Sequence, residues 1–460
     1  MDGKNKKRRT GRSALLIRVF HGPLKYILAA IVILLAAAGV LFVRKGLFTE
    51  TAPGQETAAG AETEDGTDGE SPAEQTDRFE EKDIIIGCTG AMIMHSPILE
   101  AAGQPDGSYD FSDIFTYIAP FYSAPDFMTC ELEAAVTSDP DTYSGHPMFH
   151  IPGSLVTAIA GSGVDLQFLA TNHIYDAGSE GLHGTMDFFE QNNLAYTGVR
   201  KSEEKPRWYL ADIGGIKVGF FDYTLESEGD GTWINALKVS DGDAPLINSF
   251  WPEEREPFYQ EARLIIAQLR SAGARFIIAN MHWGMEYMLE PFEYQKEMAQ
   301  TLCNMGVDAL IGGHPHCEEP VSVLTRADGS GNMFCIYSVG NAMSNQMEEF
   351  MIMDMAGGYT EDGVIVLLQV HQYADGTAGL TGVDAIPTWM YRSHTEDGAW
   401  THDFRILPLD NVAGLEERTG LAGIKKPAME SYERTLSVIG EGMAEAKKTF
   451  GTITGFRPVS

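Results

Sequence analysis

The strongest constraint on the fold of this chain is an uncharged apolar run of 18 residues, 26–43, with the sequence YILAAIVILLAAAGVLFV. A helix rises about 1.5 Å per residue, so this run is long enough to cross the hydrocarbon layer of a membrane. A buried core helix is the alternative. However, the preceding segment 1–25 is rich in Lys and Arg and contains one acid, Asp2, a flank typical of membrane anchors. The sequence therefore predicts one transmembrane helix at residues 26–43.

The charges around this run predict its orientation. Lys and Arg beside a membrane span resist translocation, so the basic tail 1–25 is expected in the cytoplasm and the rest of the chain outside. A cleaved signal peptide is the rival interpretation, but the small residues 36–39 lie inside the apolar run, and Arg44 and Lys45 follow it. We therefore expect an uncleaved, single-pass protein of the cell membrane with an extracellular main domain.

Composition divides the remainder into three predicted parts. Residues 46–80 are rich in Ala, Gly, Thr, Glu and Asp, which predicts a disordered acidic linker. Residues 82–410 form the predicted main domain, and 411–460 a helical tail. The formal net charge of −32 disfavours binding to nucleic acid and other polyanions, unless a local cationic site exists. The five cysteines have no CxxC spacing and indicate no disulfide framework.

The main domain alternates short apolar runs with longer amphipathic stretches, which is typical of α/β proteins. After residue 341 the pattern changes and predicts an additional antiparallel sheet region. The expected strands are 83–88, 126–132, 165–170, 216–223, 276–281, 307–312, 333–339, 362–373, 379–391 and 405–409, and the expected helices are 262–273, 293–306 and 427–450.

Polar clusters follow several of these predicted strands, where ligands gather in open α/β sheets. Residues 171–176 read TNHIYD, 282–286 read HWGME, and His314 and His316 follow a Gly-Gly pair expected to make a turn. Imidazole, carboxylate and carboxamide groups suit Mn, Fe, Co or Zn. A single histidine after a strand is usually structural, but this combination predicts a shared site for a divalent metal.

Four strings of the chain resemble, in order and spacing, the CapA family of bacterial capsule or poly-γ-glutamate biosynthesis proteins. They are ATNHIYDAGSEGLHGTMDFF (170–189), MHWGMEYMLEPFEYQKEMAQTL (281–302), GVDALIGGHPHCEEP (306–320) and YSVGN (337–341). SYDFSDIF (108–115) and ELE (131–133) are weaker matches. The resemblance covers about residues 83–409. It implies a calcineurin-like metallophosphatase fold, a β-sandwich flanked by helices with a metal site at the strand ends.

The resemblance also implies roles for individual residues. The implied metal-site residues are Glu133, Asn172, His282, His314 and His316. It implies that His173 is a catalytic proton donor, and we group Asp176 with it as a candidate catalytic residue. Asp176 and Glu286 could orient histidine rings, although local capping or salt bridges explain these acids equally well.

Two departures from the family pattern affect the site. The family has Gly-Asp after the first strand, whereas this chain has Gly90-Ala91, and alanine cannot coordinate a cation. Glu131 stands where the family usually has asparagine, and it adds a carboxylate that could compensate. His95 is of the family's usual type and is expected to support the site. The chain is therefore expected to bind one cation instead of two.

Three functions stay open at this point. The resemblance implies action on an anionic extracellular polymer, or with its synthesis machinery, in polymer synthesis, release or retention. An enzyme would use metal-assisted hydrolysis of a phosphoester or γ-glutamyl bond. A non-catalytic polymer-binding scaffold with a degenerate metal site is the first alternative, and a surface metallophosphoesterase is the second.

Overall fold

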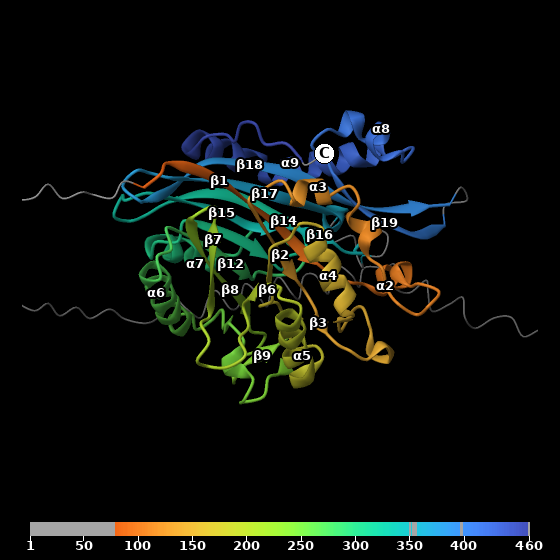
Figure 1. Cartoon of the computed structure of the whole chain (residues 1–460), viewed down its shortest axis with the longest axis horizontal. Coiled ribbons are helices and arrows are strands. Elements are labelled where there is room, and N and C mark those ends of the chain that lie inside the picture. Colours follow the sequence, from red (N-terminus) through yellow and green to blue (C-terminus); the bar gives the residue numbers. More distant parts are fainter. Residues whose placement is uncertain (1–78, 349–350, 352–356, 396–398, 459–460) are drawn as a thin grey trace, which may run out of the picture. The chain divides into compact units, whose positions relative to one another are not determined.

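The computed structural model describes residues 79–348, 351, 357–395 and 399–458 (Figure 1). The predicted membrane span at 26–43 and nearly all of the predicted linker lie outside these ranges. None of the helices within the ranges combines the length and hydropathy of a membrane span. The described chain has a mixed α/β fold built on two large sheets.

The first sheet combines parallel and antiparallel strands. Its order is β19-β18-β17-β1-β2-β5-β6, and β16 pairs with the end of β1. Strands β1, β2, β5 and β6 pair in parallel with one another. In contrast, β17 pairs antiparallel with β1, β18 with β17, and β19 with β18. The bounds are β1 Lys82–Met92, β2 Phe127–Leu132, β5 Leu166–Phe168, β6 Ala195–Thr197, β16 Asn341–Met343, β17 Asp362–Gln372, β18 Ala378–His394 and β19 Trp400–Pro408.

The second sheet is mainly parallel. Its order is β11-β8-β12-β13-β15-β14, with β7 paired to β8, and only β7 and β14 run antiparallel to their neighbours. The bounds are β7 Trp208–Ile213, β8 Ile216–Leu225, β11 Ser249–Phe250, β12 Phe276–His282, β13 Ala309–Gly313, β14 Glu318–Thr325 and β15 Asn332–Val339. Two small pairs are β3 Ala135–Val136 with β4 His150–Ile151, and β9 Trp233–Ile234 with β10 Leu237–Lys238.

The two sheets pack face to face around one apolar core. Ile86 and Phe168 of the first sheet contribute to the same buried cluster as Val218, Ile278 and Ile336 of the second. These side chains come from alternate strand positions, as expected when one face of each strand is covered by the other sheet. The sandwich implied by the resemblance is therefore observed.

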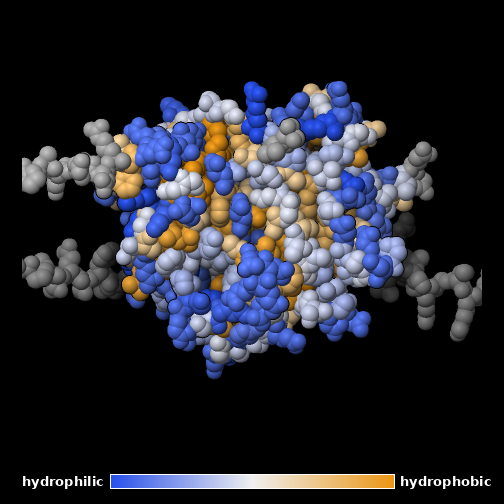
Figure 2. Space-filling model, in the orientation of Figure 1, coloured by the Kyte–Doolittle hydropathy of each residue, from blue (hydrophilic) through white to orange (hydrophobic). Residues whose placement is uncertain are grey.

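Helices cover the outer faces of the sandwich. Helices α6 and α7 pack on the second sheet, and α4 and α5 lie against the outer cluster of the first. Figure 2 shows hydrophilic residues predominating at the margins of its view, with hydrophobic residues between them nearer the centre. The helix bounds are α2 Ser96–Ala102, α3 Ala119–Tyr122, α4 Gly153–Gly161, α5 Gly178–Gln191, α6 Glu256–Ser271, α7 Glu293–Asn304, α8 Leu415–Thr419 and α9 Lys425–Phe450.

The C-terminal helix α9 forms part of the sandwich core. Its Ile439 and Met443 are buried in the cluster between the sheets, beside β14 and β18 (Figure 1). A Cβ on Gly442 would lie 2.0 Å from the carbonyl oxygen of Val321, so glycine permits this close approach to β14. The expected helix at 427–450 is thus present, and its apolar face completes the core.

Buried polar contacts also hold α9. Arg434 donates to both oxygens of the fully buried Asp362, at 2.6 and 2.8 Å, and Ser431 donates to the same carboxylate at 2.6 Å. Thr435 donates to Glu318 at 2.8 Å. Burial raises the pKa of Asp362 to about 6, against the opposing effect of Arg434. The helix therefore neutralises a carboxylate that burial alone would leave unfavourable.

All ten expected strands are present, with shifted ends. The expected antiparallel region after residue 341 is also present as β17, β18 and β19, but it is not a separate sheet. Strand β17 pairs with β1 from Lys82↔Gln372 to Cys88↔Val366, so these strands extend the first sheet. Long-range pairing of this kind leaves no signal in local apolar alternation.

Candidate metal centre

The site lies where strands from both sheets end. Strand β2 carries Glu131 and leads into Glu133, and β5 leads into the segment containing Asn172 and His173. From the second sheet, β12 ends at His282. Strand β13 leads directly into His314 and His316, so residues far apart in sequence converge at one end of the sandwich.

Glu133 lies at the centre of this convergence. Its Oε1 is 3.7 Å from His173 Nε2, 3.9 Å from His282 Nε2 and 3.8 Å from His316 Nε2. Potential ligand atoms of Glu133, His282 and His314 all lie within 4.8 Å of one another. Three buried residues of suitable type could therefore hold a metal ion.

Asn172 adjoins the same group. Its Oδ1 is 2.9 Å from His282 Nε2, and His282 Nε2 is 3.2 Å from His314 Nδ1. Asn172 and His314 are both buried. The structure therefore brings Glu133, Asn172, His282 and His314 together, and His316 Nε2 also lies 3.8 Å from Glu133 Oε1.

The two histidines after β13 have unusual backbone conformations. His314 has φ 92° and His316 has φ 60°, both in the left-handed region that side chains with a Cβ rarely adopt. Gly312 and Gly313 were expected to make this turn, but both belong to β13 and neither has a positive φ. Glycine is instead required here because a side chain would not fit: a Cβ on Gly313 would lie 2.0 Å from Glu131 Oε2.

A chain of buried polar side chains lies behind the cluster. Asn280 Nδ2 donates to Glu131 Oε1 and to Asp222 Oδ1, both at 2.9 Å. Asp222 Oδ2 accepts from the backbone N–H of Ala170 at 2.7 Å. Glu131 Oε1 also lies 3.4 Å from His282 Nδ1, so the Glu131 carboxylate faces the ring nitrogen opposite to the one nearest Asn172.

His173 and Asp176 form a pair beside the cluster. His173 Nδ1 lies 2.7 Å from Asp176 Oδ2, which also accepts from the backbone N–H of Phe149 at 2.6 Å. Asp176 Oδ1 accepts from Asn235 Nδ2 at 3.0 Å. His173 Nε2 is thereby left facing Glu133.

The electrostatics of the cluster fit a cation. Both Glu133 oxygens and Glu131 Oε2 are buried without a hydrogen-bond partner among the described residues. Burial, followed by repulsion from Glu131, raises the pKa of Glu133 well above its usual value, and burial raises that of Glu131 to about 7. Burial lowers the pKa of His282 and His314, which keeps their ring lone pairs free. A divalent cation would satisfy all these groups together.

Comparison with known proteins places this site in a family. Residues 85–346, more than half of the chain, match the family described as bacterial capsule synthesis protein PGA_cap. The chain belongs to this family. The matched range includes every residue of the cluster around Glu133, whereas β17, β18, β19 and α9 lie beyond it.

Two relatives of this PGA_cap protein come from Bacillus. The chain is 25% identical over 289 residues to the PGA biosynthesis protein CapA of Bacillus subtilis (strain 168), which covers 62% of this chain and 67% of that protein. It is 23% identical over 313 residues to the capsule biosynthesis protein CapA of Bacillus anthracis, covering 67% and 68%. The resemblance to the CapA family is confirmed.

Solved structures show weaker similarity to this PGA_cap protein. A hypothetical protein from Thermus thermophilus has a TM-score of 0.38 and 11% identity, covering 66% of this chain and 98% of that one. The calcineurin-like phosphoesterase YfkN from Bacillus subtilis has a TM-score of 0.37 and 14% identity, covering 67% and 91%.

In this PGA_cap protein, position 91 lies inside β1. Ala91 pairs with Glu131 of β2 on one side and with Asn341 of β16 on the other. Asn341 Oδ1 lies 3.2 Å from His316 Nδ1. Alanine therefore occupies a strand position between two residues that contact the cluster histidines, and it adds no ligand atom there.

The two other predicted supporting residues lie at the periphery. His95 precedes α2, where its Nδ1 accepts from the backbone N–H of Asn345 at 3.1 Å and its ring meets Phe149 edge-on. Burial and the neighbouring histidines lower the pKa of His95 to about 3. Glu286 Oε1 lies 4.0 Å from His316 Nε2, and its side chain is 41% exposed. This separation is too long for a hydrogen bond.

Sequence reasoning missed four polar residues of the site. Asn280 is the single polar position in the apolar run 276–281, and Asp222 follows the apolar run 218–221, so both were available signals. Asn341 comes two residues after the end of β15 and begins β16, so it also lies just beyond an expected strand. Asn235 lies on the turn between β9 and β10, in a segment with no apolar periodicity, so only the structure reveals it.

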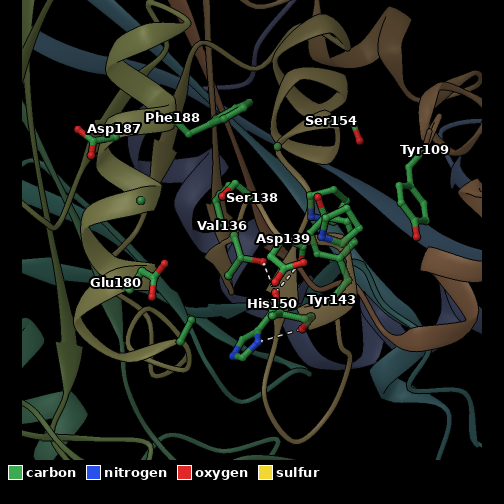
Figure 3. A pocket seen from close by; sticks show the side chains of 18 of the residues that line it. Tyr109, Val136, Ser138, Asp139, Tyr143, His150, Ser154, Glu180, Asp187 and Phe188 are labelled. Carbon is green, nitrogen blue, oxygen red and sulfur yellow. Dashed lines mark hydrogen bonds between the residues drawn. The ribbon is translucent and has the colours of Figure 1, made fainter. Parts of the chain in front are cut away.

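A separate cavity of about 850 Å³ opens between α5 and residues 136–154 (Figure 3). Glu180 and Asp187 project from α5 on one side, and Tyr109 and Tyr143 lie on the other. Within the part of the chain that the structure describes, the lining contains acids, hydroxyls and aromatic rings but no lysine or arginine. None of the residues clustered around Glu133 lines this cavity, which is therefore distinct from the candidate metal centre.

Proposed function

We propose that this protein is anchored in the cell membrane by residues 26–43 and acts outside the cell on an anionic capsule-type polymer such as poly-γ-glutamate. Membership of the PGA_cap family and the names of its Bacillus relatives support a role in capsule biosynthesis. The uncharged run and its basic flank support the anchor and its orientation. Polymer synthesis, release or retention would each require this external position.

The proposed activity is metal-dependent hydrolysis. The observation that carries it is the fully buried Glu133 carboxylate, which has no hydrogen-bond partner among the described residues and faces several imidazoles. Glu133, Asn172, His282 and His314 would hold one divalent cation, of Mn, Fe, Zn or Co, with His316 beside the same Glu133 oxygen. When bound, such a cation supplies Lewis acidity that activates water and polarises the scissile group.

The protein's own side chains would supply positioning and proton transfer. His173 Nε2 faces Glu133, so it is placed to protonate a leaving group, and Asp176 holds the opposite ring nitrogen. Glu131 lies 3.4 Å from His282 Nδ1, where it would keep the Nδ1–H tautomer and direct Nε2 toward Asn172. Asn280 and Gly313 in turn locate the Glu131 carboxylate.

A direct test combines metal content with two hydrolysis assays. The full-length protein, purified in detergent without chelator, should contain about one divalent ion per chain, in line with the cluster around Glu133. Aryl phosphates and a γ-glutamyl polymer should then be assayed side by side. Cleavage of the polymer would support the proposed substrate, and cleavage of aryl phosphate alone would favour a surface phosphoesterase. Absence of both activities would contradict hydrolysis.

A non-catalytic scaffold is the second candidate function, and Ala91 favours it. The cluster lacks the carboxylate that the family pattern has at this position, between Glu131 and Asn341. A scaffold would bind polymer at the cluster without cleaving it. Retained polymer binding in a protein that carries metal but hydrolyses neither substrate would distinguish this function from both enzymatic ones.

Ala91→Asp is predicted to raise the metal content. A second cation needs further negative charge in this buried cleft, and an aspartate between Glu131 and Asn341 would provide it. We expect an increase from about one ion per chain toward two, measured by elemental analysis of the purified protein. Ala211→Asp, a substitution at a buried position in β7, controls for nonspecific binding by an added acid. Wild-type protein that already binds two ions tightly would contradict this prediction.

The proposed orientation gives a separate prediction. Protease added to intact cells should remove the body of the protein and leave the basic tail 1–25 protected, because that tail is expected in the cytoplasm. Antibodies against a tag at each end would follow the fragments, and lysed cells would show that both ends are cleavable. A protected body with a cleaved N-terminal tag would reverse the orientation.

A further inference from the structure

We propose that Asn235 is a positioning residue for His173, an inference that rests on the proposed hydrolytic function. Asn235 Nδ2 donates to Asp176 Oδ1 at 3.0 Å and lies 3.2 Å from His173 Nδ1. It therefore contacts both members of the His173–Asp176 pair from a segment about 60 residues further along the chain.

The contacts of Asp176 show what Asn235 contributes. Oδ2 already accepts from His173 Nδ1 and from the backbone N–H of Phe149, so Oδ1 is the oxygen left for another donor. Asn235 occupies it. With both oxygens engaged, the buried carboxylate cannot rotate away from the ring without breaking a second hydrogen bond.

By holding the Asp176 carboxylate beside the ring, Asn235 acts through Asp176 to favour the Nδ1–H tautomer of His173. An amide nitrogen carries no lone pair that accepts a hydrogen bond. A hydrogen on His173 Nδ1 can therefore be donated to Asp176 but not to Asn235. This arrangement leaves the Nε2 lone pair facing Glu133 at 3.7 Å, where Nε2 would take up a second proton and the resulting imidazolium would deliver that proton to a leaving group.

The backbone at Asn235 holds this side chain in place. Asn235 and Ala236 form the two-residue turn between β9 and β10, with φ 50° and 57°. Asparagine tolerates this left-handed conformation, whereas alanine is disfavoured in it. Ile234, next to the turn, is fully buried in the outer core of the first sheet. Strain kept beside an active centre suggests a position required for function.

A second contact fixes the segment that bears this turn. Tyr175 donates to Asp243 Oδ2 at 2.8 Å, and His183 Nε2 lies 3.0 Å from Asp243 Oδ1. Residues 226–248 are therefore fastened to the segment containing His173 and Asp176 at two points, Asn235 and Asp243. These contacts hold the turn that carries Asn235 in a defined position beside His173.

Asn235→Gly tests the role of the amide, because glycine keeps the left-handed turn and removes only the side chain. Ala236→Gly is the matched control, since it changes the neighbouring turn residue and keeps the amide. In the full-length protein, Asn235→Gly should lower kcat for phenyl phosphate at least about 10-fold, with a smaller effect on 4-nitrophenyl phosphate and little change in KM, because the poorer leaving group depends more on its proton donor. Ala236→Gly should leave both rates near wild type.

Spectroscopy tests the inference independently of activity. In protein labelled with ¹⁵N-histidine, the His173 signals, assigned with His173→Gln, should report the Nδ1–H tautomer in wild type and in Ala236→Gly. Asn235→Gly should show a mixture of tautomers. An unchanged tautomer, or equal rate losses for both phosphates, would overturn the role of Asn235. A wild-type protein inactive on every substrate would contradict the proposed function, and the tautomer measurement would still decide the role of Asn235.

Discussion

Glu133→Gln is expected to remove the bound metal ion while leaving the fold intact. Glutamine keeps the shape of the side chain but loses the charge at the centre of the cluster. Metal affinity should fall by more than about 100-fold, since even the partners of metal ligands contribute about 10- to 100-fold. Isothermal titration of the metal-free, full-length protein with Zn²⁺ and Mn²⁺ would measure the change.

The metal-free protein should show the opposite trend in stability. Glu133 is fully buried without a hydrogen-bond partner among the described residues, so neutralising it removes an unfavourable charge. The midpoint temperature of thermal unfolding of metal-free Glu133→Gln should therefore be no lower than that of metal-free wild type. Glu319→Gln is a matched control, because Glu319 is also buried with a pKa raised to about 8 but contacts Gln295 instead of the cluster. Equal metal binding by Glu133→Gln would contradict the proposed centre.

Arg434→Met is expected to produce the largest loss of stability. The substitution keeps much of the apolar stem but leaves Asp362 buried without its cationic partner. Breaking a buried pair by removing one member typically costs about 3–5 kcal/mol. Urea unfolding of the full-length protein should show this decrease in the free energy of unfolding. Release of α9 from β14 and β18 would accompany it.

A second substitution distinguishes the unpaired charge from lost packing. Adding Asp362→Asn to Arg434→Met should recover part of the lost stability, because the remaining amide carries no charge. Lys426→Met is the surface control, since the Lys426–Glu430 pair on the same helix is largely exposed. It should change stability much less. A double variant as unstable as Arg434→Met alone would attribute the loss to packing.

Local sequence predicted strands better than their assembly. The run 276–281 is apolar and lies between strands β8 and β13, so its burial on both faces is visible in its composition. The pairing of β17 with β1 joins residues almost 300 positions apart and depends on which edge is free. Helix α5 was not expected, because its first turns contain three glycines, which have low helix propensity. Tertiary packing outweighs that propensity here.

The candidate site shows a similar division. Histidine and asparagine after predicted strands indicated a shared centre, and the strand ends of both sheets do bring Asn172, His282 and His314 together. The contacts that support these residues could not be predicted from the sequence. Asn235 reaches Asp176 through a two-residue turn whose position depends on tertiary contacts, and no spacing in the sequence connects the two. The left-handed backbone of His314 and His316 likewise depends on their surroundings.

The placement of the cluster across both sheets has a mechanical consequence. Glu133 and Asn172 follow strands of the first sheet, whereas His282 ends a strand of the second sheet and His314 follows another. An ion held by all four would act as a cross-link between the layers, so sliding of one sheet over the other would pull its ligands apart. Force that shears the two sheets would then act directly on the bonds between the ion and its ligands.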